Sequence, residues 1–339
     1  MRKRGSILIV FVIVILAGGA IFPGCNRQPL EAPAQEAAAS EVEMPTPAPP
    51  DLPEPVKQSA WELRFETWPM EFGFANEEGS KLIHPFYEYL DPEETDIEKE
   101  IAEEHEEGDG SEATTLMEKT GFDPDRFSLA IGTYSEMLPI HFSKWQDEKS
   151  GNNGRENANN FNNLPGFVYG QKDWKLKKNK TYLMTGMDTL IDSMFILSPP
   201  GWKGNTPPMD NEIVERIESE TGRGIIWTKT LAFAFNGTQV GVVLFERQGN
   251  DMLFSIVYID EDRILFWNNP AEYDETSTWR VDAGEEPGNF EPLVLARFNE
   301  GLFLVLLWGA PEGETVLVLY EEDGVFLQAE NLQFARYMP

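Results

Sequence analysis

Eight apolar segments separated by short turns fill the last third of the chain, and this pattern constrains the fold more than any other feature. Residues 224–235 and 238–247 flank Asn236-Gly237, a dipeptide that favours the tight turn of a β-hairpin. Six further runs rich in β-branched and aromatic residues follow, with glycine-containing turns between them. We therefore predict an antiparallel β-meander over residues 223–339, folded as a sandwich, a curled sheet or a partial barrel.

Two segments of this meander carry more specific expectations. Leu302–Trp308 is apolar at every position, which predicts a central strand covered on both faces. Residues 268–292 are polar and too long for a hairpin turn. Because long ordered loops in compact domains are often functional, we expect this loop to carry function.

The preceding region, residues 59–222, mixes strand and helix patterns. Three segments predict strands: 127–134, 138–145 and 167–172. Residues 80–90 predict a short helix that is interrupted near Pro85. A longer helix is expected to begin after Asp210 as N-cap and to end at Gly222.

These patterns predict an α+β fold, with a mixed α/β part at 59–222 followed by the antiparallel meander at 223–339. Residues 59–339 number about 280, which is enough for one large domain or two of ordinary size. One domain and two domains both remain open.

The first 24 residues have the layout of a secretory signal. Arg2, Lys3 and Arg4 form a cationic start, and the apolar run Ile7–Phe22 carries no charge. This run is shorter than the roughly 20 residues that span a bilayer as a helix. Gly24 and the single cysteine of the chain, Cys25, follow it.

This segment resembles the signal peptides of bacterial lipoproteins, in which a small residue precedes a cysteine that is lipidated on sulfur. The resemblance implies that residues 1–24 are removed and that Cys25 holds the protein on a membrane of the bacterial cell envelope, facing the periplasm or the exterior. An uncleaved signal anchor, or ordinary cleavage near Ala17-Gly18-Gly19, remains an alternative. Lipidation would consume a thiol that is a liability in an oxidising compartment.

Residues 25–58 are expected to form a disordered tether. Residues 26–58 contain eight prolines and no aromatic side chain. Such a composition buries too little apolar surface to fold, and prolines favour an extended chain. At about 3.1 Å per residue, the tether would hold a domain up to roughly 100 Å from the lipid.

Charge and motifs limit the possible functions. The formal net charge of −31 disfavours nucleic acid as a partner, because phosphate binding relies on clustered Lys and Arg. The sequence has no His-Glu-x-x-His, Gly-x-Ser-x-Gly or phosphate-binding loop, and it predicts no cofactor. His84, His105 and His141 are widely spaced, and we expect His141 to be structural, although a triad assembled in space stays open.

Two charged runs are candidate sites. Residues 91–112 contain twelve carboxylates, but their spacing lacks the pattern of an EF-hand loop, so we favour a solvated segment over a calcium site. Residues 172–180 contain five lysines. These lysines either contact anionic headgroups or envelope polymers, or they neutralise the acidic run 91–112 or simply coat an exposed turn; we favour the second interpretation. The Asn-rich stretch 151–163 predicts a loop.

Aromatic residues in polar loops provide the candidate ligand contacts. Trp202 has Gly and Pro on both sides, and Trp267 precedes Asn268 and the loop that holds Tyr273. Flat apolar rings beside amide groups bind small ligands or glycans by combining contact area with hydrogen bonds. The alternative for each tryptophan is a packing role in the core.

Two classes of function follow from these features. The first is a lipid-anchored envelope protein that binds a protein or an envelope polymer without catalysis. The second is an envelope hydrolase that uses carboxylates such as Asp274 and Glu275, which would require two carboxyl groups at a defined separation.

The lipid anchor is testable at Cys25. Cys25→Ser should abolish incorporation of labelled lipid and release the protein from membranes, because the sulfur that carries the lipid is gone. Metabolic labelling and membrane fractionation measure both effects. Unchanged labelling and fractionation of the variant would rule the anchor out.

Overall fold

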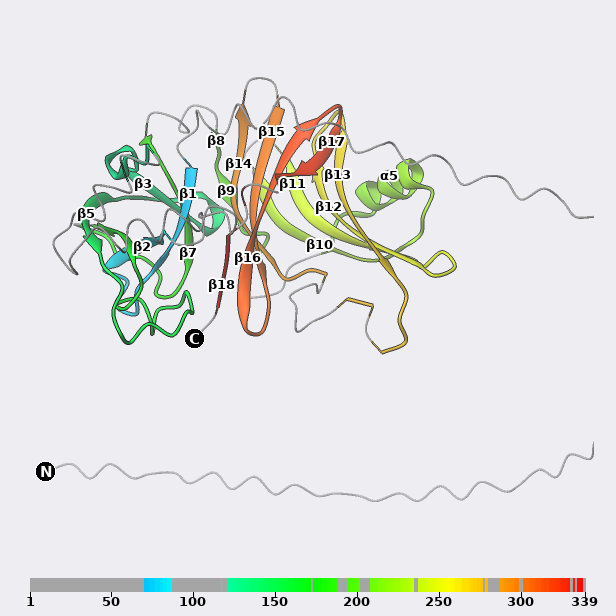
Figure 1. Ribbon diagram of the computed structural model, residues 1–339. Helices are drawn as coiled ribbons and strands as arrows, with labels where there is room; N and C mark the ends of the chain where they lie inside the picture. Colours follow the sequence, from blue (N-terminus) through cyan, green and yellow to red (C-terminus); the bar gives the residue numbers. More distant parts are fainter. Residues whose placement is uncertain are drawn as a thin grey trace, which may run out of the picture. The chain divides into compact units, whose positions relative to one another are not determined.

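The computed structural model describes residues 70–86, 117, 121–171, 173–187, 194–201, 208–234, 237–276, 278–279, 287–298, 301–329, 332 and 334–337 (Figure 1). The chain divides into two compact units, 1–56 and 57–339, and all described residues belong to the second. The signal, Cys25, the tether and the acidic run 91–112 lie outside the described residues.

Sheet A is a seven-stranded antiparallel sheet with the order β4-β3-β7-β1-β2-β6-β5. Its strands are β1 (Met70–Ala75), β2 (Lys81–Pro85), β3 (Leu129–Gly132), β4 (Glu136–Pro139), β5 (His141–Gln146), β6 (Gly166–Gly170) and β7 (Thr181–Thr185). Two 3₁₀ turns, η3 (Pro124–Arg126) and η4 (Thr133–Ser135), flank β3. The predicted strands at 127–134 and 167–172 are confirmed as β3 and β6. The single strand predicted at 138–145 is instead divided at Ile140 into β4, which pairs with β3, and β5, which pairs with β6.

Sheets B and C are formed by the C-terminal half of the chain and are also antiparallel. Sheet B has the order β17-β16-β15-β14-β8, with β18 also paired to β16, and sheet C has the order β13-β12-β11-β10-β9. The strands of sheet B are β8 (Met194–Phe195), β14 (Phe290–Phe298), β15 (Gly301–Gly309), β16 (Gly313–Glu322), β17 (Val325–Gln328) and β18 (Phe334–Tyr337). Those of sheet C are β9 (Leu197–Ser198), β10 (Ile225–Ala234), β11 (Gln239–Phe245), β12 (Asp251–Ile259) and β13 (Ile264–Glu272).

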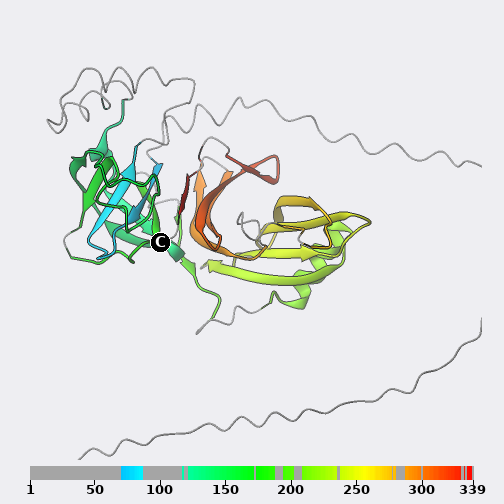
Figure 2. The ribbon, with the colours of Figure 1, turned by 60° about the horizontal axis from the view of Figure 1, so that its bottom comes forward.

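Sheets B and C together form a curled half-barrel (Figure 2), and one short segment joins them. Residues 194–195 pair with β14, and residues 197–198 pair with β10. At the other edge β13 contacts β17, and Arg263 forms a two-pronged ion pair with Glu321 of β16. The curled sheet expected for 223–339 is therefore confirmed.

Strand β15 lies in a middle layer and is covered on both faces. Phe303, Val305 and Leu307 pack toward sheet A in one core cluster. Leu304 and Leu306 pack toward sheet C in another. Because side chains alternate along a strand, a strand between two sheets must be apolar at every position, which confirms the prediction for Leu302–Trp308.

Helix α5 (Asn211–Thr221) covers the outer face of sheet C, as Figure 1 shows. The backbone carbonyl of Asp210 accepts hydrogen bonds from the N–H groups of Ile213 and Val214, each at 3.0 Å. Gly222 ends the helix with φ 64°, a left-handed conformation that glycine adopts without steric cost. Ile217 is fully buried against the sheet. The predicted helix and both of its ends are confirmed.

The mixed character predicted for residues 59–222 is only partly correct. In its described part this region builds an antiparallel sheet before α5, so the fold is mostly antiparallel β. The helix predicted at 80–90 is wrong where it is described, because residues 81–85 form β2. Leu82 and Ile83 lie on opposite faces of sheet A and are buried in two different cores, so packing on both faces favours a strand.

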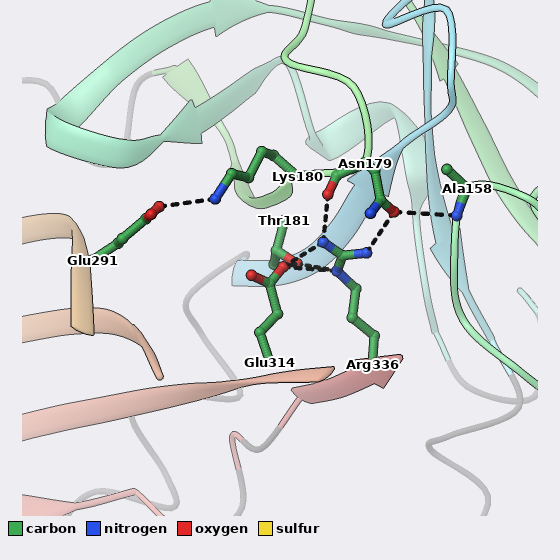
Figure 3. A network of polar contacts seen from close by, with 7 residues as sticks. All are labelled: Ala158, Asn179, Lys180, Thr181, Glu291, Glu314 and Arg336. Atoms are coloured by element: carbon green, nitrogen blue, oxygen red, sulfur yellow. Dashed lines mark hydrogen bonds and ion pairs between the residues drawn. The ribbon is translucent and has the colours of Figure 1, made fainter. Parts of the chain in front are cut away.

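A buried polar network joins sheet A to sheet B (Figure 3). The Arg336 side chain on β18 is inaccessible, and its Nε donates to Glu314 Oε1 at 2.8 Å and to Thr181 Oγ1 at 2.6 Å. Nη1 and Nη2 donate to the side-chain and backbone oxygens of Asn179 at 2.9 and 2.6 Å. Thr181 begins β7, whereas Glu314 lies on β16, so one guanidinium holds three segments together.

The chemistry of this network makes it sensitive to the loss of either charge. Burial lowers the pKa of Arg336, while the carboxylate of Glu314 opposes that shift. Arginine remains protonated at neutral pH in proteins, so its charge stays buried and depends on Glu314 for compensation. Beside this network, Lys180 forms an ion pair with Glu291 of β14 at 3.1 Å (Figure 3).

Removal of this guanidinium should strongly destabilise the protein. Arg336→Ala leaves Glu314 buried without its cation, and we expect a loss of about 3–5 kcal/mol in the free energy of unfolding. Arg297→Ala is the matched control, because Arg297 is exposed, and it should change stability by less than about 0.5 kcal/mol. Urea unfolding compares the two variants, and equal costs would contradict the role assigned to Arg336.

Candidate functional site

Four half-buried tryptophans gather at one end of the half-barrel, and we call them the tryptophan cluster. They pack against the core between sheets B and C. Three lie on strands and one lies in the connection between β13 and β14: Trp227 on β10, Trp267 on β13, Trp308 on β15, and Trp279. Half-buried tryptophans that converge from four segments form an apolar surface that retains access to solvent.

Phe254 of β12 lies at the centre of this cluster and is fully buried. Its ring centroid is 6.2 Å from that of Trp267, 5.5 Å from Trp279 and 5.8 Å from Trp308, all in edge-to-face arrangements. Phe290 stacks on Trp308 at 5.0 Å. Edge-to-face and stacked pairs stabilise aromatic rings beyond the effect of their buried area. These ring contacts, together with the strands that carry most of the rings, fix the geometry of the cluster.

Strand β10 adds a cation beside the tryptophans. Trp227 and Lys229 are two residues apart and therefore face the same side of the sheet. Lys229 Nζ donates a hydrogen bond of 2.5 Å to the carbonyl of Gly288. Gly288 has φ 98°, and a Cβ at this position would lie 2.9 Å from the Trp227 ring, so glycine permits the close approach.

The register of β12 and β13 places Asn269, rather than Asn268, on the side of the cluster. Phe254 pairs with Asn269, and Ile256 pairs with Trp267, so both β13 residues share the inner face. Asn268 faces the other way, and its Oδ1 accepts a hydrogen bond of 2.6 Å from the buried hydroxyl of Ser255. Among the described residues the side chain of Asn269 has no hydrogen-bond partner.

The sequence-predicted candidates therefore separate in the structure. Trp267 joins the cluster, and Asn268 lies on the opposite face of sheet C. Tyr273 is 38% exposed and packs against Arg247, whose guanidinium carbon lies 4.0 Å from the centroid of the Tyr273 ring. Trp202 lies outside the described residues, so its role stays a prediction.

The long loop expected at 268–292 is shorter at both ends, and that boundary prediction is wrong. β13 continues to Glu272, and β14 begins at Phe290. The polar residues Asn268, Asn269 and Glu272 pair with β12 despite their low strand propensity. Pairing along a neighbouring strand has therefore overridden the local sequence preference.

The two carboxylates proposed for hydrolysis are both exposed. Asp274 Oδ1 accepts a hydrogen bond of 2.7 Å from the N–H of Thr276, which is a local turn contact. Among the described residues no group of three or more His, Cys, Asp or Glu side chains is placed to hold a metal ion. His84 is buried with Nδ1 2.9 Å from the carbonyl oxygen of Phe72, while His141 is exposed on the edge strand β5.

A shallow depression of about 390 Å³ lies between α5 and the β12–β13 turn. Arg216 lines it and donates a 3.0 Å hydrogen bond to the backbone oxygen of Asp260. Burial favours a higher pKa for Asp260, but hydrogen bonds from Arg263, Tyr258 and Asp262 dominate and lower it. These contacts stay between the turn and α5, and among the described residues no unsatisfied buried polar group lines the depression.

Comparisons with known proteins identify no relative. No family model, no curated protein and no solved structure matches this chain. In the described residues, no helix is long and apolar enough to cross a membrane. The candidate site is therefore defined by its own geometry.

Trp227, Lys229, Asn269, Trp279 and Trp308 are absent from the candidates that the sequence analysis identified. The alternation along β13 contains a usable signal, because residues 267 and 269 share a face once the strand is extended. The other residues lie on separate strands, and only the sheet pairing brings them together.

Neighbouring asparagines should respond differently to truncation. Asn268→Ala leaves the buried Ser255 hydroxyl without its acceptor and should cost about 1 kcal/mol in the free energy of unfolding. Asn269→Ala removes no hydrogen bond among the described residues and should change that free energy by less than about 0.5 kcal/mol. Denaturant unfolding tests the pair, and a larger cost for Asn269 would reverse the assignment of faces.

Proposed function

We propose that this protein is a lipid-anchored protein of the bacterial cell envelope whose half-barrel binds a glycan polymer without acting on it. The lipid on Cys25 would hold the chain to a membrane, and the tether 25–58 would let the domain reach the polymer. The tryptophan cluster together with Asn269 would form the binding site. This proposal rests on one observation: half-buried tryptophans converge beside an amide that has no hydrogen-bond partner among the described residues.

The chemistry of the cluster favours a sugar ring. Indole faces pack against the C–H faces of pyranose rings and remove apolar surface from water. The amide of Asn269 offers a donor and an acceptor, which matches the hydroxyl groups at the edge of a sugar. Strands fix the positions of Trp227, Trp267 and Trp308, so little ordering cost is expected on binding.

The electrostatics of the site favour an uncharged stretch of glycan. Lys229 is engaged with the carbonyl of Gly288, and the whole chain has a net charge of −31. A polyanion would gain little here, because attraction through this negative field needs a local cluster of lysines such as residues 172–180, and the lysine of this site already has a partner. A neutral segment of peptidoglycan or of surface polysaccharide fits the site better.

The exposed carboxylates support binding over hydrolysis. Glycoside hydrolysis uses two carboxyl groups on either side of the scissile bond, and one of them must remain protonated. Asp274 and Glu275 are consecutive, exposed residues, and Asp274 is engaged with its own turn. The alternative function is a hydrolase with an unrecognised carboxylate site. Such an enzyme would cleave the glycan that it binds.

Binding should depend on Asn269 without a loss of folding. We expect Asn269→Ala to weaken binding to isolated peptidoglycan or surface polysaccharide about fivefold, because one neutral hydrogen bond contributes roughly 1 kcal/mol. Co-sedimentation with the polymer and thermal unfolding are measured on the same preparations. Asn159→Ala is the matched control, because Asn159 is exposed in a loop outside the half-barrel.

Two outcomes would contradict this proposal. Unchanged binding by folded Asn269→Ala removes the amide from the site. Release of reducing ends by the parent protein, when it survives repurification, replaces the binding function with a hydrolase.

A further inference from the structure

The lysine-rich connection between β6 and β7 exposes a tryptophan. Trp174 is 63% exposed, which is the highest value among the large hydrophobic residues that the structure describes. It lies in the run Asp173–Lys180, and Lys175, Lys177 and Lys178 are exposed around it. An indole ring held in water beside three cations is unlike the half-buried tryptophans of the cluster, and its exposure calls for a separate explanation.

Contacts of the residues that follow Trp174 hold this connection in place. Leu176 is buried, and its N–H donates to the carbonyl of Gly79 at 3.0 Å. Gly79 has φ 65°, and a Cβ there would lie 2.2 Å from the Leu176 oxygen, so the close contact requires glycine. The N–H of Lys177 donates to the Tyr182 hydroxyl at 2.6 Å. The exposure of Trp174 is therefore built into the fold.

The lysines are partly neutralised by single glutamates, whereas their pairing with the acidic run 91–112 stays a prediction. Lys177 lies 2.7 Å from Glu136, and Lys178 lies 3.8 Å from Glu77. The two lysine side chains nevertheless stay 55% and 74% exposed, and such surface pairs contribute little to stability. Among the described residues Lys175 has no ion-pair partner. The ammonium groups therefore remain accessible to another anion.

We infer that Trp174 and the lysines around it dock the domain on an anionic lipid surface. An indole ring fits the boundary between headgroups and acyl chains, where its face is apolar and its N–H is solvated. Each lysine close to such a surface strengthens association roughly fivefold. A bilayer offers Trp174 an apolar phase, which a soluble anionic polymer does not. This surface is separate from the tryptophan cluster, and the inference does not depend on the lipid at Cys25.

Quenching by brominated lipids tests this contact directly. The chain from residue 26 to 339 retains the whole compact unit 57–339, and an N-terminal hexahistidine tag attaches it to vesicles that contain nickel-chelating lipid. In phosphatidylglycerol vesicles with brominated acyl chains, part of the tryptophan emission should be quenched. Trp174→Phe should remove that quenched part, and Trp145→Phe should retain it. The comparison is needed because the chain has nine tryptophans.

Charge reversals in the β6–β7 connection provide the second arm of this test. Lys175→Glu with Lys178→Glu should reduce the quenched part at least fivefold. Lys144→Glu with Lys149→Glu makes the same change in net charge at exposed positions of β5 and the following turn, and it should leave quenching intact. Phosphatidylcholine vesicles should give little quenching.

The outcomes separate a lipid contact from the other possibilities. Equal quenching in the parent and Trp174→Phe, or equal effects of the two charge reversals, would overturn the inference. Binding of soluble polyphosphate, with Trp174 unquenched on vesicles, would assign the patch to an anionic polymer instead. Because the tag supplies the attachment, neither result bears on glycan binding or on Cys25.

Discussion

Burial of sheet B on both faces is the constraint on which the rest of this structure depends. β15 sends alternate side chains into two cores, one shared with sheet A and one shared with sheet C. Each removal of apolar area from water stabilises the fold, and a strand in a middle layer contributes on both sides. Sheets A and C are therefore held by their contacts with the same strand. Helix α5 covers the outer face of sheet C, and residues between strands, such as Phe122, Phe127 and Leu176, pack on the outer face of sheet A.

Apolar contact between sheets leaves their relative position weakly specified, and the polar network at Arg336 adds that specification. A buried guanidinium is compensated only when its donors meet acceptors in a fixed geometry. Thr181, Asn179 and Glu314 supply those acceptors from both sheets. If one sheet slid over the other, the buried charge of Arg336 would lose its acceptors. Apolar contacts between leucines and valines would change little in such a shift.

The local sequence pattern predicted those elements whose signals lie in consecutive residues. The hairpin around Asn236-Gly237, helix α5 and strand β15 each carry a complete signal in consecutive residues. Strand β2 and the end of β13 do not, because pairing decides their structure. β2 lies between β1 and β6, and its partners in β6 are 81–89 residues away; the end of β13 pairs with residues of β12 that are 15–21 positions earlier. The same limit applies to the candidate site. Trp267 was a candidate from the sequence, but its neighbours in the tryptophan cluster come from three other segments. The pairing of β13 with β12 places Asn269, and not the candidate Asn268, on the face of the cluster.

The position of the tryptophans follows from the layered architecture. A half-barrel made from strands of unequal length buries its middle and leaves its ends partly open, so large rings are needed where no further layer covers the core. Trp227, Trp267 and Trp308 meet this need at one end, with Trp279 laid against them from the connection. The residue type that closes such an end is also the type that binds sugar rings, because indole combines a large apolar face with a polar edge. Leucine or phenylalanine would be enough if the only role of these positions were to cover the core. In the site that we propose, a ligand would use the polar edge of indole next to the inward amide of Asn269, which has no hydrogen-bond partner among the described residues, and next to Lys229, which is engaged at Gly288.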